Sequence, residues 1–442
     1  MRSRSAMLTS HPMTERSRVL AFAHETRLVD IPDDAVRQGR RLLLDLLGVA
    51  AAGSTTELSR IVRNHAAAHF GAGPGGSSAP MLFDGRSVSP AGAALAGGMT
   101  IDSIDAHDGH RLTKGHTGCG LLPALLAFHA AEHIDDWDEF MAALIVGYEV
   151  GTRAGIALHA TVPDYHTSGA WIAVGCALVG ARTLGLDAAT TDEAIGIAEY
   201  HGPRSQMMRV IDHPSMLKDG SGWGAMAGVS ATYLAADGFT GAPAITIDSP
   251  EVTEFWSDLG SSWLIGDQYL KQFPVCRWAQ PAVAAAHHLM TEHTLRATDV
   301  VDVEVATFHE GVRLAVRHPS TTEQAQYSLP FPVAATIVHG EITPATVTTG
   351  LDDEAVNRLS GLIRVVEDPS HSAAFPGRRL ARVTLTLADG RRLESADTEA
   401  PGDPHTPLTD AEVMAKFRSY AGAAADGLER ASSVTEILAQ RM

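Results

Sequence analysis

The sequence is poor in cysteine and in charged residues, and each shortage excludes a class of protein. Its three cysteines, Cys119, Cys176 and Cys276, lie far apart in a chain of 442 residues. They form neither a disulfide framework nor a CxxC zinc site, so we expect a reducing, cytoplasmic location. Charged residues make up only 19% of the chain, so a dense cluster of them stands out.

Positive charge is also scarce, because 34 Lys and Arg face 52 Asp and Glu, a formal net charge of −18. This balance argues against nucleic acid and anionic membranes as partners. A small acidic substrate remains possible, since a basic pocket can form inside an acidic protein. No run approaches eighteen apolar residues, so no membrane-spanning segment is expected. Residues 1–16 lack the apolar core of a signal peptide and are expected to form a disordered tail.

The pattern of apolar residues predicts two domains of different texture. Up to about residue 265 the signals are helical, beginning with Pro32 and its following acidic residues and a stop at Gly53. Further helices are predicted at 57–69, 90–102, 121–133, 136–154, 168–185, 189–199 and 223–236. Alternating valines at 300–308 and two runs around the Asp389–Gly390 turn predict strands.

We therefore predict a mainly α fold with an α+β second domain. The helical domain spans 17–267 and is joined by C-terminal helices at 405–442. An α+β lid domain at 268–404 is inserted between these parts. A chain of this length is long enough for two cores.

The charged cluster lies at 101–116, IDSIDAHDGHRLTKGH, between two segments that are small and apolar. Burying so many polar groups is costly unless they have partners or a function. Three interpretations remain open. Asp105, His107, Asp108 and His110 could bind a metal; the segment could be a solvated, capped loop; or His116 or Asp105 could transfer protons near neutral pH.

Three other segments carry candidate functional residues. His166 precedes a small apolar helix, where it is either a cap or a pocket residue. The segment 201–223 sets Arg204, Arg209, His213 and Lys218 among methionines and glycines, which suits either a carboxylate pocket or a solvated loop. Lys271, Cys276 and Arg277 mark the predicted domain junction, where ligand clefts tend to form. Cys276 is either a nucleophile or a buried thiol.

Seven segments cover most of the chain in order: DLLGVAAAGS (45–54), IDSIDAHDGHRLTKGHTGCGLLPALLA (101–127), IVGYEVGTRAG (145–155), YHTSGAWIAVGCALVGARTLGL (165–186), MLKDGSGWGAMAGVSATYLAADGFTGAP (216–243), KQFPVCRWAQ (271–280) and AQYSLPFPVAATIVHG (325–340). Together they resemble the MmgE/PrpD family, whose members include 2-methylcitrate dehydratase, cis-aconitate decarboxylase and iminodisuccinate epimerase.

The resemblance implies a helical domain with an α+β lid, a homodimer, and an active site between the domains. The site residues it implies are Asp105, His116, His166, Lys218 and Lys271. Three departures point to a different substrate. The loop reads DAHDG where DFDDT is common, with Gly109 at the threonine position. Phe331 stands where decarboxylase-like members have an aromatic hydroxyl, and MLKDGSGWG replaces TKPLHxG.

The predicted function is that of a lyase needing no metal and no organic cofactor, a dehydratase that removes an α-proton and water from a hydroxylated di- or tricarboxylate. His116 and His166 transfer protons with help from Asp105, while Lys218 and Lys271 hold carboxylates. The predicted substrate-binding residues are Arg204, His213, Cys276, Arg277 and Phe331. The alternatives are an epimerase or isomerase, a decarboxylase, a non-catalytic acid-binding homologue and a metal-dependent hydrolase.

Overall fold

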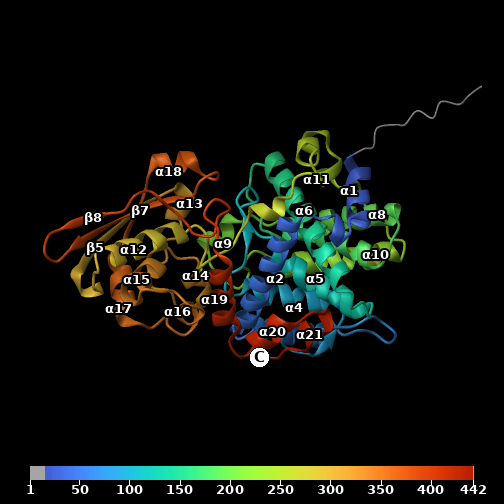
Figure 1. Ribbon diagram of the computed structural model, residues 1–442, viewed down its shortest axis with the longest axis horizontal. Coiled ribbons are helices and arrows are strands. Elements are labelled where there is room, and N and C mark those ends of the chain that lie inside the picture. The colour runs from blue at the N-terminus through green and yellow to red at the C-terminus, as the bar shows by residue number, and fades with distance from the viewer. Residues whose placement is uncertain (1–14, 442) are drawn as a thin grey trace, which may run out of the picture.

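The computed structural model describes residues 15–441, which form two lobes (Figure 1). The larger lobe contains α1 (Glu15–Glu25), α2 (Asp33–Gly53), α3 (Glu57–His69), α4 (Pro90–Asp102), α5 (Gly118–Ala131), α6 (Trp137–Thr161), α7 (Gly169–Thr183), α8 (Ala188–His201), α10 (Ser221–Ala236) and α11 (Ile245–Asp248). The C-terminal helices α19 (Asp410–Ala421), α20 (Ala425–Arg430) and α21 (Val434–Ala439) pack on the same lobe.

Local sequence signals explain the helix ends. The predicted helices at 57–69 and 90–102 coincide with α3 and α4, and the hydroxyls of Thr56 and Ser89 accept hydrogen bonds from their first turns. The helix predicted at 136–154 is longer than expected and ends at Thr161 as α6. Residues 1–14 of the predicted tail lie outside the described residues, whereas Glu15 and Arg16 already belong to α1.

Helix α6 differs from the expectation that no segment could span a membrane. By length and composition alone it is long and apolar enough to do so. However, 94% of its most apolar window is buried inside the protein, which is the situation of a core helix. The charged residues Glu149 and Arg153, which interrupt its apolar run in the sequence, are themselves buried and paired with each other.

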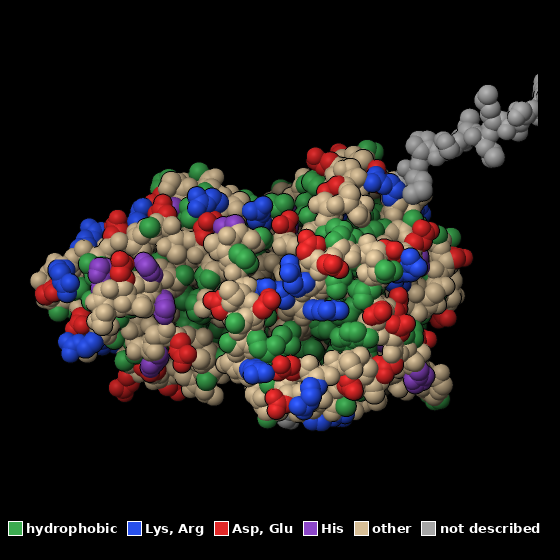
Figure 2. Space-filling view, viewed as in Figure 1, with side chains coloured by type: hydrophobic (Ala, Val, Ile, Leu, Met, Phe, Trp, Pro, Cys, Tyr) green, Lys and Arg blue, Asp and Glu red, His purple; other side chains and the backbone are tan. Residues whose placement is uncertain are grey.

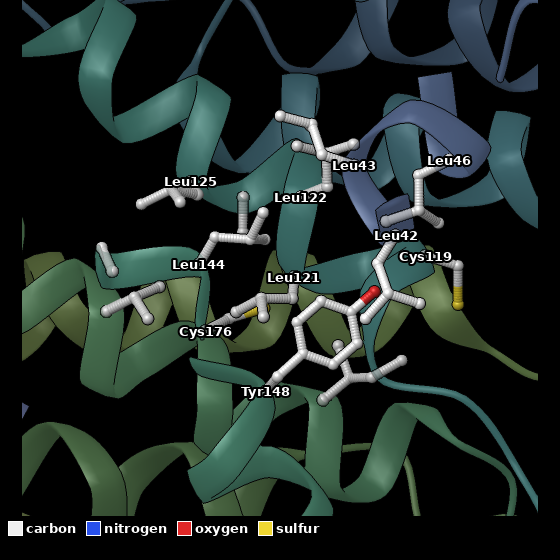
Figure 3. Close-up of a cluster of buried hydrophobic side chains, with 14 of the residues drawn as sticks. Leu42, Leu43, Leu46, Cys119, Leu121, Leu122, Leu125, Leu144, Tyr148 and Cys176 are labelled. Atoms are coloured by element: carbon white, nitrogen blue, oxygen red, sulfur yellow. The ribbon is translucent and has the colours of Figure 1, made fainter. Parts of the chain in front are cut away.

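Leucines of α2, α5 and α6 form the centre of the first core (Figure 3). Cys119 and Cys176 lie in this core as free, buried thiols. Small residues let the helices approach closely. A Cβ on Gly224 of α10, for example, would collide with the backbone of Gly169 in α7. The alanine- and glycine-rich composition therefore produces the close helix packing of this lobe.

The second lobe has a five-stranded mixed sheet in the order β6–β5–β7–β8, with β9 also paired to β7. Its elements are α12 (Gln280–Glu292), β5 (Val300–Thr307), α13 (His309–Val312), α14 (Thr322–Gln326), α15 (Pro330–His339), α16 (Pro344–Thr348), α17 (Glu354–Leu362), β6 (Arg364–Glu367), α18 (Pro369–Ala374), β7 (Leu380–Leu387), β8 (Arg392–Glu394) and β9 (Thr398–Glu399). Strands β5 and β6 are parallel, and the other pairs are antiparallel. The predicted mainly α fold with an α+β second domain is confirmed.

The two lobes exchange segments at their junction. The short helix α9 (Met208–Asp212) comes from the helical part of the chain, yet Val210 and Ile211 belong to the second core. Strand β3 (Gly109–His110) pairs with β4 (Gln268–Tyr269), so the charged loop is tied to the junction. Acidic and basic side chains are interspersed over the face shown in Figure 2. The pairing of β3 with β4 thus brings together segments that are far apart in the sequence.

Candidate active site

The acidic and histidine side chains of the loop between α4 and α5 are buried, so its interpretation as a solvated loop is wrong for them, although Arg111 and Leu112 at its tip are exposed. Asp102, Asp105, His107, Asp108 and His110 are each at most 2% exposed, and His116 is 7% exposed. Asp105 has a positive φ of 48°, a strained conformation for a non-glycine residue. Such strain tends to persist where the surrounding contacts fix a functional side chain.

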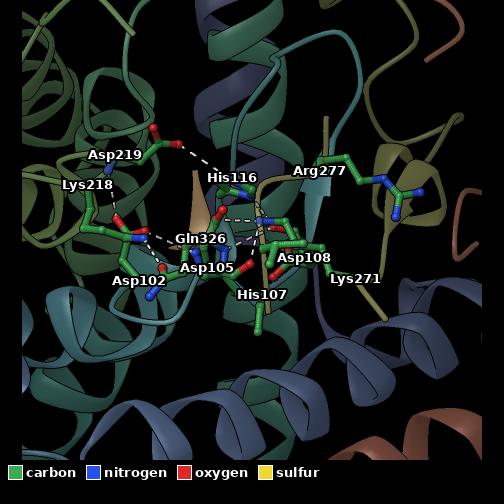
Figure 4. Close-up of polar contacts among 12 residues, drawn as sticks. Asp102, Asp105, His107, Asp108, His116, Lys218, Asp219, Lys271, Arg277 and Gln326 are labelled. Atoms are coloured by element: carbon green, nitrogen blue, oxygen red, sulfur yellow. Dashed lines mark hydrogen bonds and ion pairs between the residues drawn. The ribbon is translucent and has the colours of Figure 1, made fainter. Parts of the chain in front are cut away.

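The imidazole of His116 has a fixed orientation and tautomer. Its Nδ1 lies within hydrogen-bond distance of the Asp108 carbonyl oxygen, which can only accept, so Nδ1 carries the proton. Burial, with the charges of His107 and Lys271, lowers the pKa of His116 well below its usual value. At neutral pH the ring is therefore neutral, and Nε2 presents a lone pair. That atom lies 3.6 Å from Oδ2 of Asp219 (Figure 4).

Asp219 belongs to a network of two buried carboxylates. Ser168 Oγ lies 2.7 Å from Asp219 Oδ2, and the Asp219 amide donates to Asp102 at 3.2 Å. Burial and the nearby Asp102 carboxylate raise the pKa of Asp219 to about 7. Although burial works against ionisation of Asp102, its hydrogen bond and charge interaction with His107 bring its pKa to about 2. One carboxylate therefore stays ionised while the other can carry a proton near neutral pH.

Lys271 and Asp105 form a buried ion pair across the junction. Lys271 Nζ lies 2.6 Å from Asp105 Oδ1 and donates to the Asp105 carbonyl oxygen at 2.9 Å. Burial opposes the charged form of Lys271, but the Asp105 carboxylate outweighs it and raises the lysine pKa. The structure thus brings together Asp105, His116 and Lys271, three of the residues predicted as catalytic.

Lys218 approaches the same cluster from the segment before α10. Its side chain is 1% exposed, its φ is 51°, and Nζ donates to Gln326 Oε1 at 2.5 Å. The ammonium also lies 4.6 Å from the centroid of the Tyr327 ring. In residues 15–441 no carboxylate lies within ion-pair distance of Lys218 Nζ. The ammonium of Lys271, by contrast, is already paired with Asp105. Lys218 is therefore the ammonium better able to receive an external carboxylate.

A second ion pair supports the loop from behind. Lys416 of α19 lies 2.7 Å from Asp45 of α2 and donates to the carbonyl oxygen of Ala106 at 2.7 Å. Burial lowers the pKa of Lys416 and raises that of Asp45. The C-terminal helix thus contacts the backbone next to Asp105.

The possible metal ligands are a different set from those predicted. Asp105, His107 and His116 place ligand atoms within 4.8 Å of one another, whereas Asp108 and His110 are not in this group. Two of the three already have other partners, since Asp105 is paired with Lys271 and His107 lies 3.3 Å from Asp102. A metal would have to compete with these contacts, so the donor set fits a proton-transfer site better.

His166, Arg204 and His213 lie outside this buried cluster. In the described part of the chain, no hydrogen bond or ion pair joins His166 to His116, and the backbone amide of His166 donates to His159 instead. Arg204 and His213 are exposed. A cavity of about 270 Å³ is bordered by Lys218 together with Thr167, Pro203, Ser205, Gln206, Arg209, Val210, Leu217, Gly220 and Trp223. It is the observed opening nearest to Lys218.

Three of the predicted substrate-binding residues, Cys276, Arg277 and Phe331, are buried inside the protein. Burial raises the pKa of Cys276 to about 12, which argues against a nucleophilic thiolate. Arg277 pairs with Asp403 at 2.9 Å and donates to the Pro401 carbonyl, so its own ion pair argues against the predicted contact with substrate. Phe331 is fully buried in the second core. It contributes packing there, not a wall of the cavity beside Lys218.

Sequence reasoning missed Asp219, Asp102, Gln326 and Tyr327. Asp219 is adjacent to Lys218 in the sequence, so its position was available as a signal. Nothing local to Gln326 indicates that it contacts Lys218, because 108 residues separate the two. Only the packing of the two lobes brings these groups together.

Comparison with known proteins agrees with the two-part architecture. The MmgE/PrpD N-terminal domain matches residues 17–252, and the MmgE/PrpD C-terminal domain matches residues 273–440. The chain is 25% identical to a cis-aconitate decarboxylase-like protein, oryM, of Aspergillus oryzae, over 94% of both chains. It is 24% identical to cis-aconitate decarboxylase of Homo sapiens, over 90% of this chain and 86% of the human one, and also 24% identical to that of Mus musculus. The chain belongs to the MmgE/PrpD family.

Proposed function

We propose that the protein is a cofactor-independent lyase that removes water from a hydroxylated di- or tricarboxylate. The observation that carries this proposal is the pairing of a neutral His116, with Nε2 free to accept a proton, and Asp219, whose pKa is about 7. A base and an acid that both work near neutral pH are what such an elimination requires.

The proposed reaction begins with a substrate carboxylate held by the Lys218 ammonium. His116 Nε2 removes the proton from the carbon next to this carboxylate, and the lysine stabilises the negative charge that develops on the carboxylate oxygens. Asp219 gives its proton to the leaving hydroxyl, so that water departs and a carbon–carbon double bond forms. Proton transfer from His116 to Asp219, 3.6 Å apart, then restores the starting state.

The ion pair of Asp105 and Lys271 supports the proposed base. The ammonium of Lys271 lies near His116 and lowers the pKa of the imidazole, which helps keep it neutral before the reaction. His116, Asp105 and Lys271 are nearly inaccessible, so substrate entry requires the lobes to separate or the neighbouring segments to move. Closure would then exclude water and strengthen the electrostatic contacts.

Decarboxylation is the second candidate, because two relatives at 24% identity are named cis-aconitate decarboxylase and one at 25% is named cis-aconitate decarboxylase-like. In that reaction a carboxylate leaves as CO₂, and the carbanion left behind takes a proton, for which Asp219 is a suitable donor. The same residues would therefore serve both chemistries. The products separate them: water and an alkene in one case, CO₂ and a protonated carbon in the other.

The test is incubation of the protein with hydroxylated di- and tricarboxylates and with cis-aconitate in D₂O, followed by NMR and CO₂ detection. Dehydration predicts a new alkene without CO₂. His116→Asn should abolish turnover. The control His129→Asn, which removes a buried histidine in α5 away from the site, should retain turnover. Unchanged turnover in His116→Asn would sink the assignment. Deuterium exchange into a recovered isomer without loss of water would indicate an epimerase.

A further inference from the structure

Arg379, immediately before β7, is a buried cation without a counterion. The residue is 5% exposed, and Nη2 donates a hydrogen bond to the carbonyl oxygen of Arg111 at 3.1 Å, while the guanidinium also interacts with the side chain of Tyr269. Nε and Nη1 are buried without a hydrogen-bond partner. Within residues 15–441 no carboxylate lies within ion-pair distance of this guanidinium, although Arg378 next to it is paired with Glu399.

Other buried arginines of the chain show how unusual this is. Arg153 pairs with Glu149 and Asp258, and Arg277 pairs with Asp403. A buried charge without a partner costs several kcal/mol, so proteins ordinarily supply one. A buried arginine that has no carboxylate partner within the protein is suited to bind an external anion, because its planar N–H groups match carboxylate oxygens.

Arg379 and the proposed base His116 both lie near the ring of Tyr269. The guanidinium carbon of Arg379 lies 5.4 Å from the centroid of the Tyr269 ring, and the His116 ring lies 6.5 Å from the same ring. Tyr269 pairs with Gly109 in the β3–β4 ladder. A Cβ added to Gly109 would collide with both Tyr269 Oη and His116 Nδ1, so those two groups meet at this glycine. Arg379 therefore approaches the site from the second lobe, and Lys218 from the first.

We propose that Arg379 binds a second carboxylate of the substrate, while Lys218 holds the carboxylate next to the reacting carbon. This inference rests on the proposed function and deepens it, because it assigns a separate residue to each of two carboxylates of the substrate. The arginine contact that was predicted for Arg277 is thereby assigned to Arg379, which no sequence motif singles out. A ligand bridging Lys218 and Arg379 would stabilise the closed arrangement of the lobes.

The space around Arg379 is too small for a carboxylate in this structure. The cavity has a volume of about 10 Å³, room for roughly one water molecule, and Arg111, Glu399 and Asp403 border it together with Arg379. Both of these acids already have arginine partners, Arg378 and Arg277. A polycarboxylate cannot enter it without movement of the lobes. The substrate would therefore meet one cation first and the other as the site closes.

The test uses tricarballylate, a tricarboxylate with neither a hydroxyl nor a double bond, so that binding is measured without turnover. Calorimetry with the full chain should show binding to wild type, and Arg379→Met should weaken it at least ~10-fold, the usual worth of a hydrogen bond to a charged group. Arg379→Lys should bind with intermediate strength. Arg378→Met, which alters the neighbouring exposed arginine, should bind as wild type does.

Thermal unfolding without ligand separates binding from a structural role. Because Arg379→Met removes an uncompensated buried charge, its melting temperature should equal or exceed that of wild type, and tricarballylate should raise it less. Equal tricarballylate affinity in wild type and Arg379→Met would overturn the inference while leaving the proposed function intact. Failure of wild type to bind any di- or tricarboxylate would overturn both. A large fall in the ligand-free melting temperature would show that Arg379 is structural.

Discussion

Nε2 of His116 faces Asp219 and lies 3.6 Å from Asp219 Oδ2. It is the ring nitrogen that can gain or lose a proton, because Nδ1 is held by the carbonyl oxygen of Asp108. The two residues come from loops more than a hundred positions apart. Their contact depends on Ser168, which accepts the His116 amide hydrogen bond and lies 2.7 Å from Asp219. This serine fixes the distance across which a proton would pass.

The pH dependence of activity should follow Asp219. With its pKa raised to about 7 by burial and by Asp102, the acid is protonated below that pH and loses its proton above it. Turnover should therefore decline as the pH rises through about 7. Asp219→Asn should lower kcat by roughly 10²-fold or more and remove this decline. A basic limb that persists unchanged in Asp219→Asn would assign it to another group.

Asp108→Asn should stabilise the protein at pH 8. Burial raises the pKa of Asp108 to about 6, so between about pH 4 and 6 the folded state binds more protons than the unfolded state, and stability falls as the pH rises. Above pH 6 the native protein must hold a buried charge. The amide removes that penalty, which we expect to be about 1–3 kcal/mol.

Urea unfolding at pH 4 and pH 8 measures this effect. The variant and wild type should have similar stability at pH 4 and differ at pH 8. Lower stability of Asp108→Asn at pH 8 would show that the carboxylate makes favourable contacts when charged.

Lys416→Met should destabilise the protein by about 3–5 kcal/mol, because it leaves Asp45 buried without a counterion. The double variant Asp45→Leu/Lys416→Met should recover most of this loss but not the hydrogen bond to Ala106. Hydrogen–deuterium exchange of residues 103–110 should therefore stay faster than in wild type.

The matched control is Glu139→Leu/Arg182→Met, which removes another ion pair whose arginine also donates to a carbonyl oxygen. Equal exchange in both double variants would contradict support of the loop by Lys416.

Gln326→Leu should lower kcat/KM by about tenfold, and it should also lower stability, because Gln326 Nε2 donates to the Ser103 carbonyl oxygen and to Thr322 Oγ1 inside the protein. The leucine cannot accept the hydrogen bond from Lys218 Nζ, so the ammonium loses the contact that orients it across the lobes. Gln324→Leu, on the same short helix α14, contacts Ser320 and provides the comparison. Steady-state kinetics would show whether only the first variant is impaired.

Cys276→Ser should keep most of the activity. The thiol is buried and its pKa is raised to about 12, so little thiolate exists at neutral pH. Iodoacetamide should accordingly react slowly with the folded protein. Loss of turnover that parallels alkylation of Cys276 would contradict this expectation.

The sequence predicts the helices of this fold well because their end signals are local. Thr56 and Ser89 act as caps within three residues of themselves, and the Asp389–Gly390 turn joins its two strands directly. The charged loop at 101–116 was recognisable for a similar reason, since its composition contrasts with its immediate neighbours. Proposing the MmgE/PrpD family required only segments in order, and the domain matches confirm it.

The pairing of charges was not predictable in the same way. Arg277 and Arg379 look alike in sequence, but one meets Asp403 and the other meets no carboxylate in the described chain. Likewise, nothing around Lys416 indicates that its ammonium reaches Ala106, 310 residues earlier. These contacts depend on tertiary packing between segments far apart in the chain, and no local pattern encodes that geometry.

The contact between Lys416 and Ala106 also sets an order of events during synthesis. A ribosome that has made the charged loop, helices α1–α11 and the sheet has still not made Lys416, whose ammonium donates to the loop backbone. Nascent chains therefore carry an incomplete site until α19 emerges and docks against α2. A function that depends on this contact would therefore require that α19 has been synthesised and has docked, after the preceding segments have had time to fold.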